Sequence, residues 1–132
     1  MDVMRGGVLT VRTETPISEI AQVLAGKRVS ALPVVDDYMN LLGIVSEKDV
    51  LASLFAPNGT VLMARDLMTA DVVSFNIHDD LFEICDRLVR EEFRRVPILD
   101  QGKLVGIVSR TDIMQHIARD KSNFPVYNAQ KL

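Results

Sequence analysis

The stretch Val29-Ser30-Ala31-Leu32-Pro33-Val34-Val35-Asp36, followed after a short turn by Leu41-Leu42-Gly43-Ile44-Val45-Ser46-Glu47-Lys48-Asp49, decides the fold. Each stretch holds a short apolar, β-branched run bounded by turn residues, which is typical of a buried strand. Residues 36–40 are the predicted hairpin turn between the two strands. Ser46 is a predicted helix N-cap, because apolar residues follow it at helical spacing.

The same pair of stretches occurs again later in the chain. Phe93-Arg94-Arg95-Val96-Pro97-Ile98-Leu99-Asp100 repeats the first strand, and Leu104-Val105-Gly106-Ile107-Val108-Ser109-Arg110-Thr111-Asp112 repeats the second. Pro33 and Pro97 lie 64 positions apart, whereas Gly43 and Gly106 lie 63 apart, so the second hairpin is one residue shorter. This regular spacing predicts a tandem structural repeat.

Each repeat is predicted to be β-α-β-β-α, which gives an α/β fold. Residues 8–11 and 72–75 are the predicted first strands. Thr15 is the expected N-cap of the first helix, with Pro16 as its first residue and Gly26 at its end. The corresponding second helix is expected to begin after Asp79-Asp80 and to run through Glu92.

A three-stranded sheet of this length cannot bury both of its faces alone. The two repeats are therefore expected to pack together and to share one core. The expected domains are a first repeat over residues 1–56, a linker over 57–65, a second repeat over 66–118 and a C-terminal tail over 119–132.

Composition limits the functional classes. The net charge of −3 gives no basic field that would attract nucleic acid or an anionic membrane surface. No run approaches the length of a membrane span, and the N-terminus does not resemble a signal peptide. The single cysteine, Cys85, lies on a predicted apolar helical stripe and is expected to be buried in a protein of the reducing cytoplasm.

The sequence contains no recognisable catalytic constellation. His78 and His116 stand alone, without the spacing of metal ligands, so no metal site is expected. No phosphate-binding glycine loop, nucleophile elbow or Cys-His pairing is present. We therefore expect a protein that is not an enzyme and requires no cofactor.

Two pairs, Ser46-x-x-Asp49 and Ser109-x-x-Asp112, allow two interpretations. Ser-x-x-Asp before an apolar helix is close to a capping box, which is a purely structural device. The same helix start offers free amides to an anion, and the acid can accept hydrogen bonds from a sugar diol.

Arg94-Arg95 stands where the first repeat has Ser30-Ala31. These arginines are either solvated charges or guanidinium groups directed toward a phosphate.

On these motifs the chain resembles a tandem pair of cystathionine-β-synthase (CBS) domains, a Bateman module, over about residues 2–117. The marks are the doubled strand with its central proline and the doubled Gly-Ile-Val-Ser-x-x-Asp. The resemblance implies two repeats packed sheet to sheet about a pseudo-twofold axis. It also implies two clefts that accept AMP, ADP, ATP or S-adenosylmethionine.

The resemblance further implies two sets of ligand-binding residues. In the first cleft the adenine would be held by Gly7, Leu9, Val29 and Ile44, the ribose by Asp49 with Ser46, and the phosphate by Arg95 with help from Lys48. In the second cleft the adenine wall would be Asp71, Val73, Phe93 and Ile107, the ribose would meet Asp112 with Ser109 and Thr111, and Ser30 and Ala31 would come from the first repeat. Arg94 is a further candidate.

The leading functional hypothesis is a regulatory module that senses an adenosine-containing ligand and signals to a protein partner. Such modules commonly form homodimers through their helices, for which the faces Ile17–Leu24 and Leu51–Phe55 are candidates. The alternative is a structural dimerisation module in which the Ser-x-x-Asp pairs are helix caps only.

Overall fold

The computed structural model describes Met4 and residues 6–119. The helices and strands follow one another along the chain in the order α1 Ile17–Lys27, β1 Ala31–Val35, β2 Leu41–Ser46, α2 Glu47–Ala52, the 3-10 turn η1 Ser53–Phe55, α3 Ala64–Leu67, β3 Phe75–Asn76, α4 Leu81–Arg90, β4 Arg95–Asp100, β5 Lys103–Ser109 and α5 Arg110–Arg119. The predicted mixed α/β fold is therefore confirmed. The expected tail lies outside the described residues apart from its first position, Arg119, which ends α5.

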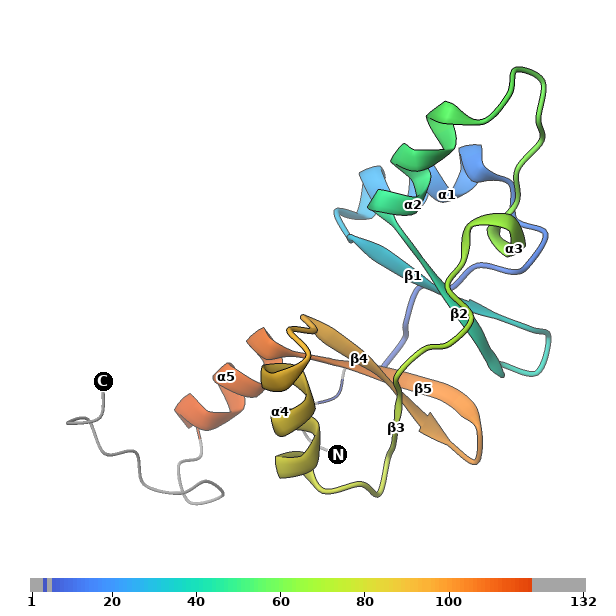
Figure 1. The fold of residues 1–132 in the computed structure, drawn as a ribbon. Helices are drawn as coiled ribbons and strands as arrows, with labels where there is room; N and C mark the ends of the chain where they lie inside the picture. Colours follow the sequence, from blue (N-terminus) through green and yellow to red (C-terminus); the bar gives the residue numbers. More distant parts are fainter. Residues whose placement is uncertain (1–3, 5, 120–132) are drawn as a thin grey trace.

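The two hairpins have the same register. Pro33 of β1 lies opposite Ile44 of β2, and Pro97 of β4 lies opposite Ile107 of β5. The helices α1 and α2 lie on one outer side and α4 and α5 on the other, so the two hairpins are adjacent in the middle (Figure 1). This arrangement leaves the strands of each repeat facing the other repeat.

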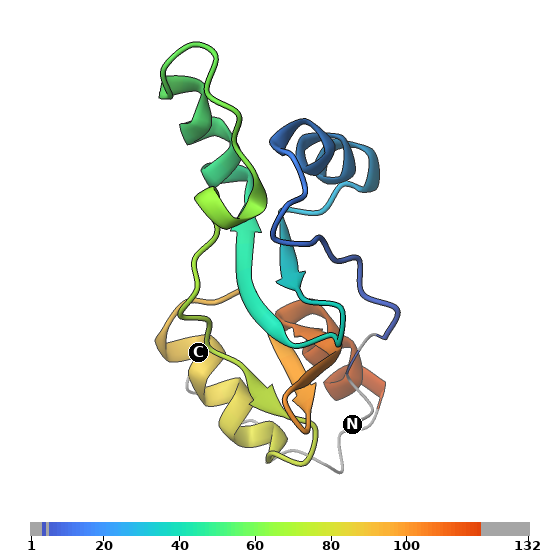
Figure 2. The same ribbon diagram turned by 90° about the vertical axis from the view of Figure 1, so that its right-hand side faces the viewer.

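The tips of the two hairpins are joined. The Leu104 amide donates a hydrogen bond of 2.8 Å to the Met39 carbonyl, and the Lys103 ammonium donates one of 2.9 Å to the Tyr38 carbonyl. Figure 2 shows the β1–β2 turn meeting the second sheet at this point.

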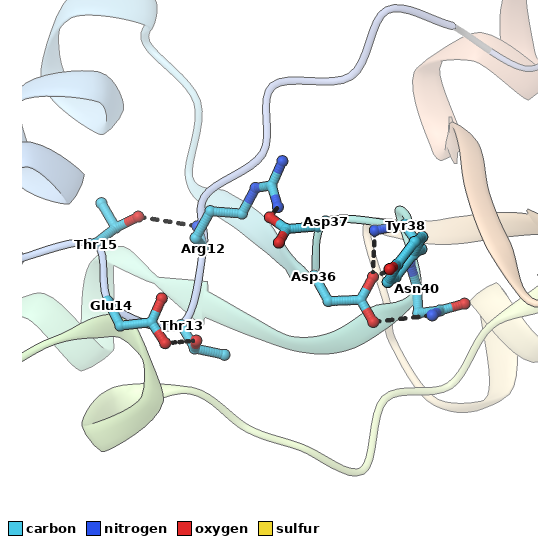
Figure 3. Close-up of polar contacts among 8 residues, drawn as sticks. All are labelled: Arg12, Thr13, Glu14, Thr15, Asp36, Asp37, Tyr38 and Asn40. Atoms are coloured by element: carbon cyan, nitrogen blue, oxygen red, sulfur yellow. Dashed lines mark hydrogen bonds and ion pairs between the residues drawn. The ribbon is translucent and has the colours of Figure 1, made fainter.

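The shape of the first turn is fixed by Asp36. Its carboxylate accepts hydrogen bonds from the amides of Tyr38 and Asn40 and from the Asn40 side chain, while Arg12 pairs with Asp37 (Figure 3). These bonds hold the pKa of Asp36 below its ordinary value of 3.8, the Asn40 side chain being the main cause.

The first strands are shorter than predicted. In the first repeat only Val11 pairs, in a parallel bridge with Val34 of β1. In the second repeat the strand is β3, which pairs in parallel with β4. Residues 8–10 run alongside the fold without strand pairing.

The ends of the crossover helices also differ from the prediction. Pro16 is the N-cap of α1 rather than its first residue, because the Thr15 hydroxyl instead accepts a hydrogen bond from the Arg12 amide. α1 continues past Gly26 to Lys27 and ends at Arg28, which has a left-handed φ of 54°. In α4 the last residue is Arg90.

The expected single core is wrong, because the buried side chains form two clusters, one for each repeat. Ile20, Leu32 and Val34 belong to the first cluster, and Ile84 and Ile98 to the second. Each repeat contributes one methionine to the core of the other. Met4 packs against the second cluster, and Met68, the equivalent residue of the second repeat, packs against the first.

Cys85 is only partly buried, at the edge of the second cluster. This outcome corrects the expectation of a buried cysteine. Burial nevertheless raises the pKa of the Cys85 thiol.

Candidate functional site

The two Ser-x-x-Asp pairs form the same local structure. In each, the serine amide and hydroxyl donate to the aspartate Oδ2, and the aspartate amide donates back to the serine Oγ. The Ser109 hydroxyl to Asp112 carboxylate distance is 2.8 Å and the Ser46 to Asp49 distance is 2.9 Å. Both pairs therefore cap their helices.

Burial distinguishes the two aspartates. Asp112 is 8% exposed, and among the described residues it is the charged residue that is buried. Asp49 is half-buried. A buried carboxylate needs hydrogen-bond donors around it, so Asp112 is the more constrained of the two.

A cavity of about 380 Å³ lies between the repeats and is reached by the start of α5. Its size falls within the range of small-molecule sites. Most of its wall is apolar, and its polar groups gather at the β4, β5 and α5 side. The lining residues are Gly6, Val8, Leu9, Val29, Ala31, Leu32, Pro33, Arg95, Ile107, Ser109, Thr111 and Asp112.

The first repeat supplies one wall through its extended N-terminal segment and β1. Val11 fixes that segment, since its amide donates to the Pro33 carbonyl at 3.0 Å and its carbonyl accepts from the Val35 amide at 2.9 Å. Leu9 and Val29 line the cavity from the first repeat, and Ile107 of β5 lines it from the second.

The second repeat supplies the polar wall. Of the first three amides of α5, that of Arg110 donates to the Arg94 carbonyl and that of Asp112 to the Ser109 hydroxyl. Within the described residues the Thr111 amide and the Arg95 guanidinium make no hydrogen bond. Thr111 and Arg95 both line the cavity, and a helix amide and a guanidinium are groups that bind anions.

The structure groups the predicted site residues differently from the prediction. Leu9 and Val29 were expected beside Ile44, Ser46 and Asp49 of their own repeat, but they share the cavity with Ile107, Ser109 and Asp112. The reason is that each repeat's opening segment crosses to the other: the Ile44 and Thr69 backbones exchange hydrogen bonds of 3.0 and 2.9 Å.

The remaining predicted residues do not line this cavity. They are Gly7, Ser30, Ile44, Ser46, Lys48, Asp49, Asp71, Val73, Phe93 and Arg94. Ala31 and Arg95 both line the cavity. They occupy equivalent positions in the two repeats. Sequence reasoning missed Gly6, Val8, Leu32 and Pro33; the available signal was that they lie in the same two segments as the predicted residues Leu9 and Ala31.

Within residue 4 and residues 6–119, no group of three or more histidine, cysteine or acidic side chains is placed to hold a metal ion. No described helix has both the length and the apolar character required to cross a bilayer.

This doubled unit, with a cavity between its halves, defines the class of protein. The chain belongs to the CBS domain family, whose model matches residues 1–56 and again residues 64–119.

Among solved structures, the chain is similar to CBSX2 in complex with AMP, with 29% identity, a TM-score of 0.81 and coverage of 91% of this chain and 96% of that one. CBSX2 from Arabidopsis thaliana gives a TM-score of 0.79 at 29% identity, covering 93% of this chain and 96% of that one.

Among curated proteins, 5'-AMP-activated protein kinase subunit gamma-3 of Homo sapiens is 37% identical over 117 residues, which is 81% of this chain and 24% of that subunit. Protein MJ1225 of Methanocaldococcus jannaschii is 29% identical over 119 residues, which is 90% of this chain and 42% of that protein. The chain thus spans less than half of these two relatives.

Proposed function

We propose that this CBS pair is a regulatory module that binds an adenosine-containing ligand in the cavity between its repeats. The supporting observation is the cavity, whose wall is mostly apolar and also includes the Asp112 carboxylate, the start of α5 at Thr111 and the Arg95 guanidinium. CBSX2, which is similar over nearly the whole chain, is described in complex with AMP.

Each part of such a ligand has a matching group on the wall. Leu9, Val29 and Ile107 line the cavity and would offer apolar contact to an adenine ring. The Asp112 carboxylate would accept hydrogen bonds from the ribose hydroxyls. Arg95 and the Thr111 amide would meet the part of the ligand attached to the ribose. AMP, ADP, ATP and S-adenosylmethionine differ only in that part.

The position of the cavity supports signalling to a partner. Its walls come from both repeats, so a bound ligand favours the arrangement of repeats that contacts it best. A second copy of the chain is the partner we propose, because α2, η1 and the following segment expose Leu51, Leu54, Phe55 and Val61, of which Phe55 is 90% exposed. Within Ile17–Leu24, Ile20 and Leu24 are buried in the first cluster, so a contact through this helix would use its exposed side, with Ser18, Glu19 and Gln22.

One observation favours the alternative of a purely structural dimerisation module. Both Ser-x-x-Asp pairs are complete helix caps, so neither aspartate needs a ligand to explain its position. A test must therefore separate capping from ligand binding.

Asp112→Asn and its matched control Asp49→Asn provide this separation. Both replace the charged member of a cap, but only Asp112 lines the cavity. Thermal unfolding of the wild type, with AMP at about 100 times its Kd, should show stabilisation of about 2.7 kcal/mol. Asp49→Asn should keep most of this ligand effect and Asp112→Asn should lose it.

The same titration should be made by calorimetry with AMP, ATP and S-adenosylmethionine. Absence of heat and of any thermal shift at millimolar concentrations of all three ligands would leave the structural alternative in place.

A further inference from the structure

The turn of the first hairpin is one residue longer than that of the second, and it contacts the other repeat. We propose that this hairpin-tip contact, made by Tyr38 and Met39 with Lys103 and Leu104, holds the two repeats in the arrangement that forms the cavity. Lys103 is its positioning residue, which acts through the repeats and lies outside the cavity wall. The inference rests on the proposed function and adds a point of control at a distance from the ligand.

The shape of the longer turn directs its backbone toward the second repeat. Met39 has a left-handed φ of 65°, which residues other than glycine seldom adopt. In this conformation the Tyr38 carbonyl accepts a hydrogen bond of 2.9 Å from the Lys103 ammonium, and the Met39 carbonyl accepts one of 2.8 Å from the Leu104 amide. Such a backbone conformation persists where the surrounding contacts fix it, and these two bonds across the boundary are contacts of that kind.

The Leu104 amide lies at the edge of the second sheet. The strand order of that sheet is β3-β4-β5, so β5 has a neighbouring strand on one side only. Leu104 is 4% exposed, and a backbone amide without a partner at a buried position is costly. The Met39 carbonyl supplies the partner, and Asn40 and Lys103 form an antiparallel bridge at the same place. The first hairpin therefore continues the second sheet at this point.

Lys103 adds a charge to the backbone contact. Besides the hydrogen bond to the Tyr38 carbonyl, its Nζ atom lies 5.7 Å from the centroid of the Tyr38 ring, which is within the range of a cation–π interaction. The Asn40 side chain is the main cause of the lowered pKa of Asp36, and the charge of Lys103 lowers this pKa further. Lys103 and Tyr38 are both exposed, so a substitution at Lys103 leaves the two cores intact.

The hairpin-tip contact and the cavity lie at different points along β5. Lys103 is the first residue of the strand, and Ile107, which lines the cavity, is about 13 Å further along it. The facing wall comes from the first repeat, so separation of the tips would displace one wall from the other. A ligand that contacts both walls binds the joined arrangement, and by linkage it must stabilise the hairpin-tip contact.

Hydrogen exchange followed by nuclear magnetic resonance tests the contact itself. The Leu104 amide is the reporter, and the Val35 amide, which donates to the Val11 carbonyl at 2.9 Å within the first repeat, is the reference. Lys103→Met removes the charge and should lower the protection of Leu104 by about three- to tenfold, while that of Val35 changes by less than about twofold. Equal protection of Leu104 in this variant and in the wild type would overturn the inference.

Two further variants show whether the charge is responsible. Lys103→Arg keeps the charge and the donor and should retain the protection of Leu104 to within about twofold. Lys27→Met is the matched control, because Lys27 is exposed at the end of α1 and makes no hydrogen bond or ion pair within the described residues. It should leave both amides unchanged. Loss of protection in Lys27→Met equal to that in Lys103→Met would also overturn the inference.

The link to the ligand is tested in Lys103→Met, where Leu104 exchanges by separation of the tips rather than by unfolding. With AMP at about ten times its Kd for this variant, the protection of Leu104 should rise about tenfold, because AMP binds the joined arrangement. Protection that does not change, with AMP binding confirmed by calorimetry, would overturn this inference and leave the proposed function intact. Absence of AMP binding to the wild type would overturn both.

Discussion

Replacing Gly43 by alanine tests the contact between the opening segment of the second repeat and the β1–β2 hairpin. A Cβ atom at Gly43 would lie 2.7 Å from the Thr69 carbonyl oxygen and 2.9 Å from the Met68 sulfur. The methionine can move, but the Thr69 carbonyl is backbone and is held by the hydrogen bonds exchanged with Ile44. Overpacking of this kind costs about 1–3 kcal/mol.

The matched control is Gly26→Ala. Gly26 is exposed in the last turn of α1, and a Cβ there meets no atom within 4 Å. Because alanine is the better helix former, this substitution should raise the free energy of unfolding by about 0.5–1 kcal/mol. The two glycine substitutions are therefore expected to have opposite signs.

Urea denaturation followed by far-ultraviolet circular dichroism measures both effects, with an unchanged m-value indicating that the folded and unfolded states keep their compactness. A Gly43→Ala protein as stable as the wild type would contradict the close approach of Thr69 to β2.

Two further predictions concern titratable groups. Because hydrogen bonds lower the folded-state pKa of Asp36, they stabilise the folded chain above pH 3.8 and lose this effect as the pH falls through the lowered value; Asp36→Ala should therefore lower the melting temperature at pH 7 by more than at pH 3, and an equal decrease at both pH values would refute this. Burial raises the pKa of the Cys85 thiol, so iodoacetamide at pH 7.5 should alkylate Cys85 more slowly in the native protein than in urea, as followed by mass spectrometry, and equal rates would contradict the partial burial.

The sequence allowed the two hairpins to be predicted, because the repeated Gly-Ile-Val-Ser-x-x-Asp and the strand prolines are local patterns. The length of the first strand of each repeat was overestimated for a related reason. Val8–Val11 has strand-like composition, but only Val11 is close enough to β1 to form hydrogen bonds. Pairing depends on where the neighbouring strand ends, and a local window does not contain that information.

Several residues that line the cavity were predicted from the sequence, but they were assigned to different clefts. Leu9, Val29, Arg95 and Asp112 all line the cavity, yet the first two had been assigned with Asp49 rather than with Asp112. The tertiary structure determines which helix start lies next to which opening segment. The crossing of Met68-Thr69 onto β2 decides it, and no spacing within one repeat specifies that crossing.

The exchange of Met4 and Met68 has a consequence for any half-length version of this chain. In one repeat made alone, the methionine would have no second core to pack against, and the core would lack the methionine that the other repeat supplies. A second copy of the same half would supply both missing contacts at once, so such fragments should assemble as a domain-swapped dimer.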